Sequence, residues 1–178
     1  MAKDNKLLLS EESVPSRLGY QGFIVSDDGM KTYARNYKCG SPGLGSGQEW
    51  TAPLTAAGIR AAAVRDGLIE TDPPQGGGIP QIPPQYAETR HLVALVVDPD
   101  PNNGDFHWYR LDNNGRWSHK PGLTPIINYD GNGNVIDDPR QAANFPNGPN
   151  YRFVCFMTVI KNIVKKKGEK ETGRCVTC

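Results

Sequence analysis

The chain has 178 residues, of which 37% are hydrophobic, with 20 glycines, 15 prolines and a formal net charge of +1. This length predicts one domain with its own core, and the glycine and proline content argues against a helix bundle and for a loop-rich β or α+β domain. The small net charge gives no overall attraction to nucleic acid or to a membrane surface, and no run of 18 apolar residues predicts a transmembrane helix.

The N-terminal part of the chain carries weak structural signals. Residues 1–19 are predicted to be a polar leader, whose three-leucine patch is too short for the core of a signal peptide. A short strand is expected at residues 20–26, where it ends in an Asp-Asp-Gly turn signal. Residues 30–48 show little periodicity and are predicted to be an irregular or short helical piece followed by a loop.

The clearest helix is predicted at residues 55–68. Thr55 can cap its N-terminus, the alanine-rich positions have high helix propensity, and Gly67 is a typical C-terminal stop. Residues 71–86 contain five prolines and three glycines, a composition that predicts an extended connector without regular structure.

The second half of the chain has the pattern of an antiparallel sheet. Residues 91–98 are apolar on both faces and predict a central strand. A hairpin is expected from residues 106–111 and 116–120, a smaller one around residues 130–134, and a last strand at residues 151–160. The order of one helix followed by about four to six antiparallel strands predicts an α+β fold, in a single domain at residues 20–160.

The last 18 residues, 161–178, form a basic tail. They contain six basic and two acidic residues, which gives the tail a charge of +4 and leaves about −3 for the rest of the chain. We expect this tail to be disordered. The four cysteines are too few for a disulfide scaffold and predict a reducing, cytoplasmic location.

Two of the three histidines, His107 and His119, lie on the two strands of the first expected hairpin. Their relative position depends on the number of residues in the turn, because side chains alternate between the two faces of a strand. A three-residue turn with Gly115 in its third, left-handed position places His119 opposite Tyr109, and both imidazoles then lie on one face of the sheet. A two- or four-residue turn would place them on opposite faces.

Two histidines on one face need a third partner, either a metal or a nucleophile. His91 could complete a zinc site, but no H-x-H, H-E-x-x-H or paired C-x-x-C pattern favours one. Nucleophilic catalysis requires a cysteine beside an oriented imidazole, and Cys39 is the only cysteine that precedes the helix and the strands. From the residues alone, Cys39 is either this nucleophile or a small buried side chain.

The spacing of Asp130, Asn132 and Asn134 matches the first half of a calcium-binding loop. The glycine that such a loop needs is missing, and its twelfth position is Gln141 in place of glutamate. Turn chemistry is therefore the favoured interpretation of this segment.

Several segments together resemble a family of papain-like cysteine hydrolases related to the NlpC-type bacterial cell-wall amidases, with members in bacteria, phages and large viruses. The resemblance runs from about Pro42 to Met157, and its most specific pieces are "RAAAVRDGL" and "HWYRLDNNGRWSHKPG". It implies a papain-like, NlpC-type α+β fold, in which a cysteine lies at the N-terminus of a helix packed on an antiparallel sheet.

The resemblance also implies roles for individual residues. His107 matches the general base, and His119 matches the third residue, which orients the base. With Cys39 as the nucleophile, the thiolate would attack an amide or ester carbonyl. The aromatic residues beside the histidines would line the substrate site: Trp108, Tyr109 and Trp117.

The chain departs from the family at the nucleophile. The family carries its cysteine in an Asn-Cys-Tyr run that opens a helix well before a Pro-Gly pair, whereas here Pro42 follows Cys39 after only two intervening residues. Two functions therefore remain open. One is a cysteine hydrolase of a peptide-like amide bond; the other is an inactive papain-like domain that serves as a binding or structural protein, for instance in a virus particle. Neither involves a metal or cofactor, and the expected partner is a peptide-like substrate or another protein.

Overall fold

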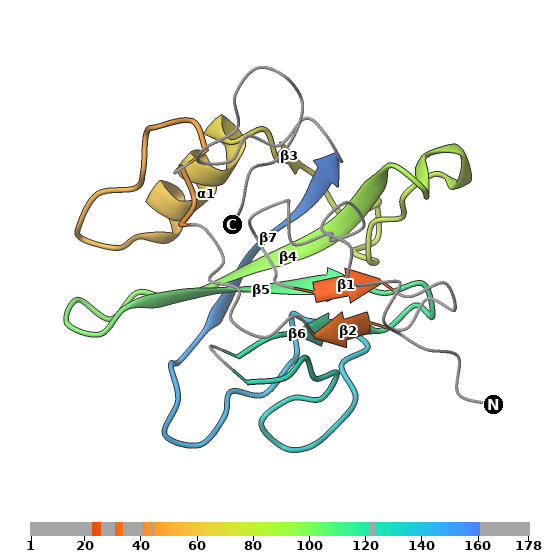
Figure 1. The fold of residues 1–178 in the computed structure, drawn as a ribbon. Helices are drawn as coiled ribbons and strands as arrows, with labels where there is room; N and C mark the ends of the chain where they lie inside the picture. The colour runs from red at the N-terminus through yellow and green to blue at the C-terminus, as the bar shows by residue number, and fades with distance from the viewer. Residues whose placement is uncertain (1–22, 26–30, 34–40, 44, 122–123, 161–178) are drawn as a thin grey trace.

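The computed structural model describes residues 23–25, 31–33, 41–43, 45–121 and 124–160 (Figure 1). The predicted leader, residues 1–19, and the predicted basic tail, residues 161–178, lie outside these ranges. Within them, no helix is long and apolar enough to cross a membrane.

The main element is a five-stranded sheet in which every neighbouring pair of strands is antiparallel. In spatial order its strands are β3 (Ile69–Glu70), β7 (Arg152–Ile160), β4 (Arg90–Asp98), β5 (Asp105–Leu111) and β6 (Trp117–His119) (Figure 1). The described part of the chain has one α-helix, which precedes all five of these strands, and this combination of a helix with an antiparallel sheet confirms the predicted α+β class. The apolar strand β4 lies at the centre, as its sequence predicts.

A separate two-stranded sheet pairs β1 (Phe23–Val25) with β2 (Lys31–Tyr33). The first of these strands falls within the predicted strand at residues 20–26. The second falls where an irregular or short helical piece was expected, and that expectation was wrong. A three-residue strand is too short to show periodicity, and its structure comes from pairing with β1.

Helix α1 (Ala56–Arg65) forms where the sequence predicts a helix, but it ends earlier than residue 68. At its start, Thr55 Oγ1 accepts a hydrogen bond from the Gly58 N–H at 3.0 Å, which is the expected N-cap. At its end, Asp66 caps the helix and Gly67 adopts a φ of +100°, a left-handed conformation that favours glycine. Leu68 is therefore released from the helix and enters the core.

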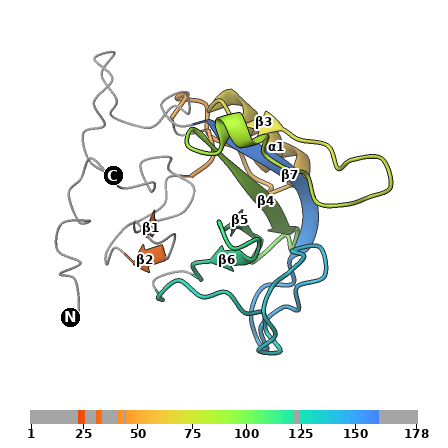
Figure 2. The ribbon, with the colours of Figure 1, turned by 90° about the vertical axis from the view of Figure 1, so that its right-hand side faces the viewer.

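The sheet has a core on each face. On one face α1 packs through Ile59 and Ala63 against alternate residues of the central strands: Val93, Leu95, Val97, Trp108, Met157 and Val159. The other face carries the complementary set, which is covered by loops: Leu92, Ala94, Val96, Tyr109, Trp117, Ile136 and Phe156. Figure 2 shows α1 at one side of the sheet and the long loop between β6 and β7 at the other. We call these two sides the helix face and the loop face.

The hairpin of β5 and β6 has the three-residue turn that the sequence predicts. Tyr109 pairs with His119 and Leu111 with Trp117, and the Asp112 N–H donates to the Arg116 carbonyl at 2.7 Å. Gly115 closes the turn with a φ of +78°. The prediction that both imidazoles lie on one side of the sheet is confirmed.

The loop between β6 and β7 is organised by a buried carboxylate. Asp130 Oδ1 accepts hydrogen bonds from the backbone N–H groups of Asn132 and Asn134, each at 3.0 Å, and Gly133 follows with a φ of +80°. This segment is a turn, as its sequence favours. The predicted second hairpin is reduced to an isolated bridge between Tyr129 and Val135.

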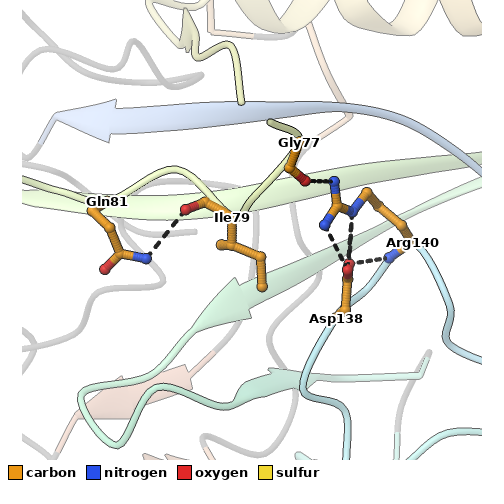
Figure 3. Close-up of polar contacts among 5 residues, drawn as sticks. All are labelled: Gly77, Ile79, Gln81, Asp138 and Arg140. Atoms are coloured by element: carbon orange, nitrogen blue, oxygen red, sulfur yellow. Dashed lines mark hydrogen bonds and ion pairs between the residues drawn. The ribbon is translucent and has the colours of Figure 1, made fainter. Parts of the chain in front are cut away.

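The proline-rich connector is joined to the same loop by Arg140. Its guanidinium donates to both carboxylate oxygens of Asp138 and to the Gly77 carbonyl, the latter at 2.5 Å (Figure 3). Ile79 and Ile82 of the connector pack against the apolar cluster of the loop face. The connector is irregular through Pro83, as expected, and continues into a 3-10 turn, η4 (Pro84–Tyr86).

Asp66 connects the end of α1 to the segment that precedes it. Its two carboxylate oxygens accept hydrogen bonds from the backbone N–H groups of Gly43, at 2.7 Å, and Ser46, at 2.8 Å, and only 2% of Asp66 is exposed. Without the carboxylate the buried Gly43 N–H and the partly buried Ser46 N–H would lose their acceptor.

We expect Asp66→Ala to lower the free energy of unfolding by about 2–4 kcal/mol, because it leaves two backbone donors without an acceptor. Denaturant unfolding followed by tryptophan fluorescence measures this loss. Asp72→Ala, at an exposed position, is the matched control and should change stability by less than about 0.5 kcal/mol. Equal losses for the two variants would contradict the proposed anchoring role of Asp66.

We expect Gly115→Ala to cost about 1 kcal/mol of unfolding free energy. An added Cβ would meet no atom within 4 Å, so the cost comes from the left-handed backbone alone. The same unfolding measurement on Asn113→Ala, in the same turn, should show a smaller change. If alanine were tolerated equally well at both positions, the turn geometry would be incorrect.

Candidate functional site

The candidate site is centred on His107 and His119, which lie on the neighbouring strands β5 and β6. His107 Nε2 is 2.9 Å from His119 Nδ1, a hydrogen-bond distance, and the ring centroids are 5.1 Å apart at 79°. His119 is buried, with 2% of its surface exposed, whereas His107 is half-buried. The pairing of β5 with β6 places the two rings side by side on one face of the sheet.

The positions of the protons follow from one backbone carbonyl. The Tyr129 carbonyl oxygen lies 3.1 Å from His119 Nε2, and a carbonyl can only accept, so Nε2 must carry the proton. A neutral imidazole has a single N–H, so His119 Nδ1 is an acceptor and His107 Nε2 donates to it. His107 Nδ1 is then an unprotonated acceptor, and it has no hydrogen-bond partner among the residues that the structure describes.

Aromatic rings surround the pair on the loop face. Tyr151 stacks on His107 with centroids 5.5 Å apart, and its hydroxyl donates to Asp105 Oδ2 at 2.5 Å. Tyr109 contacts both imidazoles, with centroids 5.6 Å from His107 and 4.8 Å from His119. Phe145 lies 6.0 Å from His119. These rings fix the orientation of the imidazoles and remove water from them.

This environment favours the neutral form of both histidines. Burial, followed by the effects of His119 and Lys120, lowers the pKa of His107 from 6.5 to about 3. Burial also lowers the pKa of His119, and the hydrogen bond to the Tyr129 carbonyl opposes that shift only in part. At neutral pH the pair is therefore a hydrogen-bonded chain of neutral rings.

The three predicted substrate-binding residues do not form one surface beside the histidine pair. Tyr109 lies against both histidines, as expected. Trp108 points to the helix face, where it is 3% exposed within the core that α1 covers. Trp117 lies on the loop face but is fully buried against Phe156. As placed, the two tryptophans are core residues, because strand alternation turns Trp108 away and the β6–β7 loop covers Trp117.

The predicted nucleophile, Cys39, lies outside the described residues. Ser41, two residues later, accepts a hydrogen bond from Trp50 Nε1 at 2.8 Å, and Trp50 packs against the core of the helix face. The free cysteine in the described part of the chain is Cys155, which β-strand pairing places opposite Leu95 on the helix face. Burial raises the pKa of its thiol to about 11.

Tyr151 and the carbonyl of Tyr129 are part of the site, and no pattern in the sequence predicted either of them. Tyr151 immediately precedes β7 and is far from the histidines in the chain. In the sheet β4 lies between β7 and β5, yet the ring of Tyr151 stacks on His107. The Tyr129 carbonyl is a backbone group, which no residue-type pattern can identify.

Among the described residues, no metal-binding group forms around the pair. His91, the third ligand of the zinc alternative, lies on the helix face, where its Nδ1 is 3.1 Å from an Arg110 amino group. In the part of the chain that the structure describes, no three His, Cys, Asp or Glu side chains are placed to hold a metal ion together.

We expect acidification from pH 7.5 to pH 5 to destabilise the protein. The unfolded chain takes up protons near the ordinary histidine pKa of 6.5, whereas folded His107 does not until about pH 3, so stability falls as the pH drops below 6.5. His107 alone contributes a loss of about 2 kcal/mol by pH 5. Carboxylates such as Asp130, whose pKa is lowered by backbone hydrogen bonds, act only below about pH 4.

Denaturant unfolding at pH 7.5 and pH 5 measures this loss. His107→Gln keeps a donor for His119 but cannot titrate, so its loss over the same interval should be smaller by about 2 kcal/mol. Identical losses in the two proteins would mean that folded His107 is protonated near its ordinary pKa.

Comparison with known proteins gives a limited set of relatives. No family model matches the chain, and no solved structure matches it. A curated relative is "Insoluble matrix shell protein 1" of Ruditapes philippinarum, which is 38% identical over 117 residues; these cover 64% of this chain and 69% of the relative.

An identity of 38% sustained over 69% of the relative's length is expected only of homologous proteins, so the chain belongs to the family of insoluble matrix shell protein 1.

Proposed function

We propose that this chain is a binding or structural protein of an insoluble matrix and that its histidine pair is not used for hydrolysis. The observation that carries the proposal is the relationship to a protein named for an insoluble shell matrix. Such a role favours association with an insoluble matrix over the cytoplasmic location expected from the cysteines.

The electrostatics of the pair also favour a non-hydrolytic role. A free cysteine thiol has a pKa near 8.5, whereas the pKa of His107 is about 3. Transfer of the thiol proton to this imidazole would cost about 7 kcal/mol before any bond to a substrate forms. The nearby rings favour the neutral form of His107. A neutral imidazole suits a packed site, whereas an ion pair with a thiolate requires the charged form.

The geometry of α1 points the same way. In the papain-like arrangement the nucleophile lies at the N-terminus of a helix packed on the sheet. Here the N-terminus of α1 begins at Thr55 and the helix packs on the helix face, whereas His107 and His119 are on the loop face. We therefore infer that α1 does not carry a nucleophile to this pair, which counts against hydrolysis.

An exposed apolar surface beside the pair is the expected contact with a protein partner. It consists of Tyr129, Val135 and Phe145, which are 42%, 42% and 37% exposed. Tyr129 bridges to Val135 and lies 6.5 Å from Phe145 between ring centroids, so the three side chains form one surface. Large apolar side chains grouped on a surface are typical of an interaction site.

Cysteine hydrolysis of a peptide-like amide bond is the second candidate. The observation that favours it is the bare Nδ1 of His107, which is oriented as an acceptor by His119. In this function the Cys39 thiol would lose its proton to Nδ1, and the thiolate would attack the amide carbonyl. The proton would then pass to the leaving amine, and water would release the acyl group.

Alkylation of Cys39 separates the two functions. Full-length protein is treated with iodoacetamide at pH 7, and the rate at each cysteine is measured by peptide mass spectrometry. We expect Cys39 to react no faster than Cys175 or Cys178, and His107→Ala to leave its rate unchanged. A rate at least ten times that of the tail cysteines, abolished in His107→Ala, would instead favour hydrolysis.

Co-sedimentation tests the matrix role. We expect the full chain to pellet with insoluble matrix prepared from Ruditapes philippinarum shell, and Tyr129→Ala to lower the bound fraction severalfold. Tyr86→Ala is the matched control, since Tyr86 is a comparably exposed aromatic residue, at 38%. Failure of the wild type to pellet, or equal loss in both variants, would contradict the proposed matrix contact.

A further inference from the structure

We propose that Asp130 is a positioning residue that sets the tautomer of His107, although its side chain hydrogen-bonds to backbone groups of its own loop and to neither imidazole. It would act through the carbonyl of the preceding residue, Tyr129, and through the ring of His119. The inference goes beyond the two functions above. It concerns whether His107 Nδ1 is a hydrogen-bond acceptor or a hydrogen-bond donor toward a binding partner.

The first step is the hold of Asp130 on its own loop. Oδ1 accepts from the N–H groups of Asn132 and Asn134, and Oδ2 accepts from the N–H of Ala143 at 3.0 Å. The backbone of Gly131 adds a hydrogen bond to the Ala143 carbonyl at 2.9 Å. One buried carboxylate thereby joins the 130–134 turn to the segment at residue 143, so that neither can shift independently of the other.

The second step is the position of the Tyr129 carbonyl. On the N-terminal side it is fixed by a pair of backbone hydrogen bonds between His119 and Ile127, at 2.8 and 2.9 Å, and on the C-terminal side by Asp130. Between these two anchors the carbonyl oxygen points at His119 Nε2, 3.1 Å away. The direction of this carbonyl depends on both anchors, because rotation of the 129–130 peptide would turn it away.

The third step is the effect of the Tyr129 carbonyl on the protonation of His107, which it exerts through His119. With the carbonyl in place, His119 must be protonated on Nε2, and His107 must donate from Nε2 and keep Nδ1 bare. Without it, the His119 proton can move to Nδ1 and be donated to His107 Nε2. His107 would then carry its own proton on Nδ1, and its free nitrogen would change from an acceptor to a donor.

The tautomers can be measured without any substrate. Full-length protein labelled with ¹⁵N-histidine is examined at pH 7.5 by long-range ¹H–¹⁵N correlation, which distinguishes protonated from bare ring nitrogens. In the wild type we expect His107 and His119 both to be protonated on Nε2. His91 is an internal reference, because it lies on the opposite face of the sheet.

Asp130→Asn removes the acceptor for the Ala143 N–H and should give a mixture of tautomers at His107 and His119, with His91 unchanged. Asp138→Asn is the matched control. It weakens the ion pair with Arg140 in the same loop (Figure 3). The carboxylate of Asp138 binds Arg140 and not the residues around Tyr129, so the tautomers of this variant should match the wild type.

Two results would overturn the proposal. One is a wild-type His107 that carries its proton on Nδ1; the other is an Asp130→Asn protein whose tautomers match the wild type. If Asp130→Asn does not fold, Asp130→Glu, which keeps the charge but moves the carboxylate by one methylene, is expected to give the same mixture. A failed alkylation or co-sedimentation experiment would leave these outcomes unaffected, so the proposal can fail independently of the proposed functions.

Discussion

The alternation of side chains along β5 and β6 is the constraint on which the site depends. A three-residue turn sets Tyr109 opposite His119, and one residue more or fewer would send one imidazole to the other face of the sheet. The left-handed backbone at Gly115 stabilises this turn, since a side chain there would be strained. A local feature of the backbone therefore determines whether two histidines can form a hydrogen bond at all.

The two faces of the sheet carry different side-chain environments because a helix packs on one and irregular loops pack on the other. The helix face is closed by the small residues of α1, which allow the helix to approach Val93 and Leu95 closely. The loop face is covered by the connector and the β6–β7 loop. Charged side chains bind the backbone of these segments: Asp130 accepts from the β6–β7 loop, and Arg140 donates to the Gly77 carbonyl of the connector. Irregular segments expose carbonyls and N–H groups to the side chains beneath them, and the Tyr129 carbonyl on His119 is one result.

The histidine pair has two properties with opposite effects on its use as a general base. Its orientation is that of a base, with a bare Nδ1 on His107. Its surroundings, which include the stacked ring of Tyr151, exclude water and keep it neutral. Burial lowers the pKa of His107 to about 3, which makes it a weak base. The packing of these neutral rings supports the structural role that we propose from the relationship to an insoluble matrix shell protein.

The sequence by itself determined the α+β class, the position of α1, the central place of β4 and the register of the histidine hairpin. These follow from local rules, namely helix caps, apolar runs, turn chemistry and strand alternation, so each could be derived from neighbouring residues. The same rules put Tyr109 on the face of the histidines.

Only the tertiary structure decided the rest. It shows Tyr151 against His107, Trp108 on the far face and Trp117 in the core, and it shows which carbonyl fixes the imidazole protons. Each of these contacts joins segments that are distant in the chain or uses the backbone alone. Such contacts depend on how the sheet and its loops pack, and the identity of a residue carries no information about which backbone group will face it.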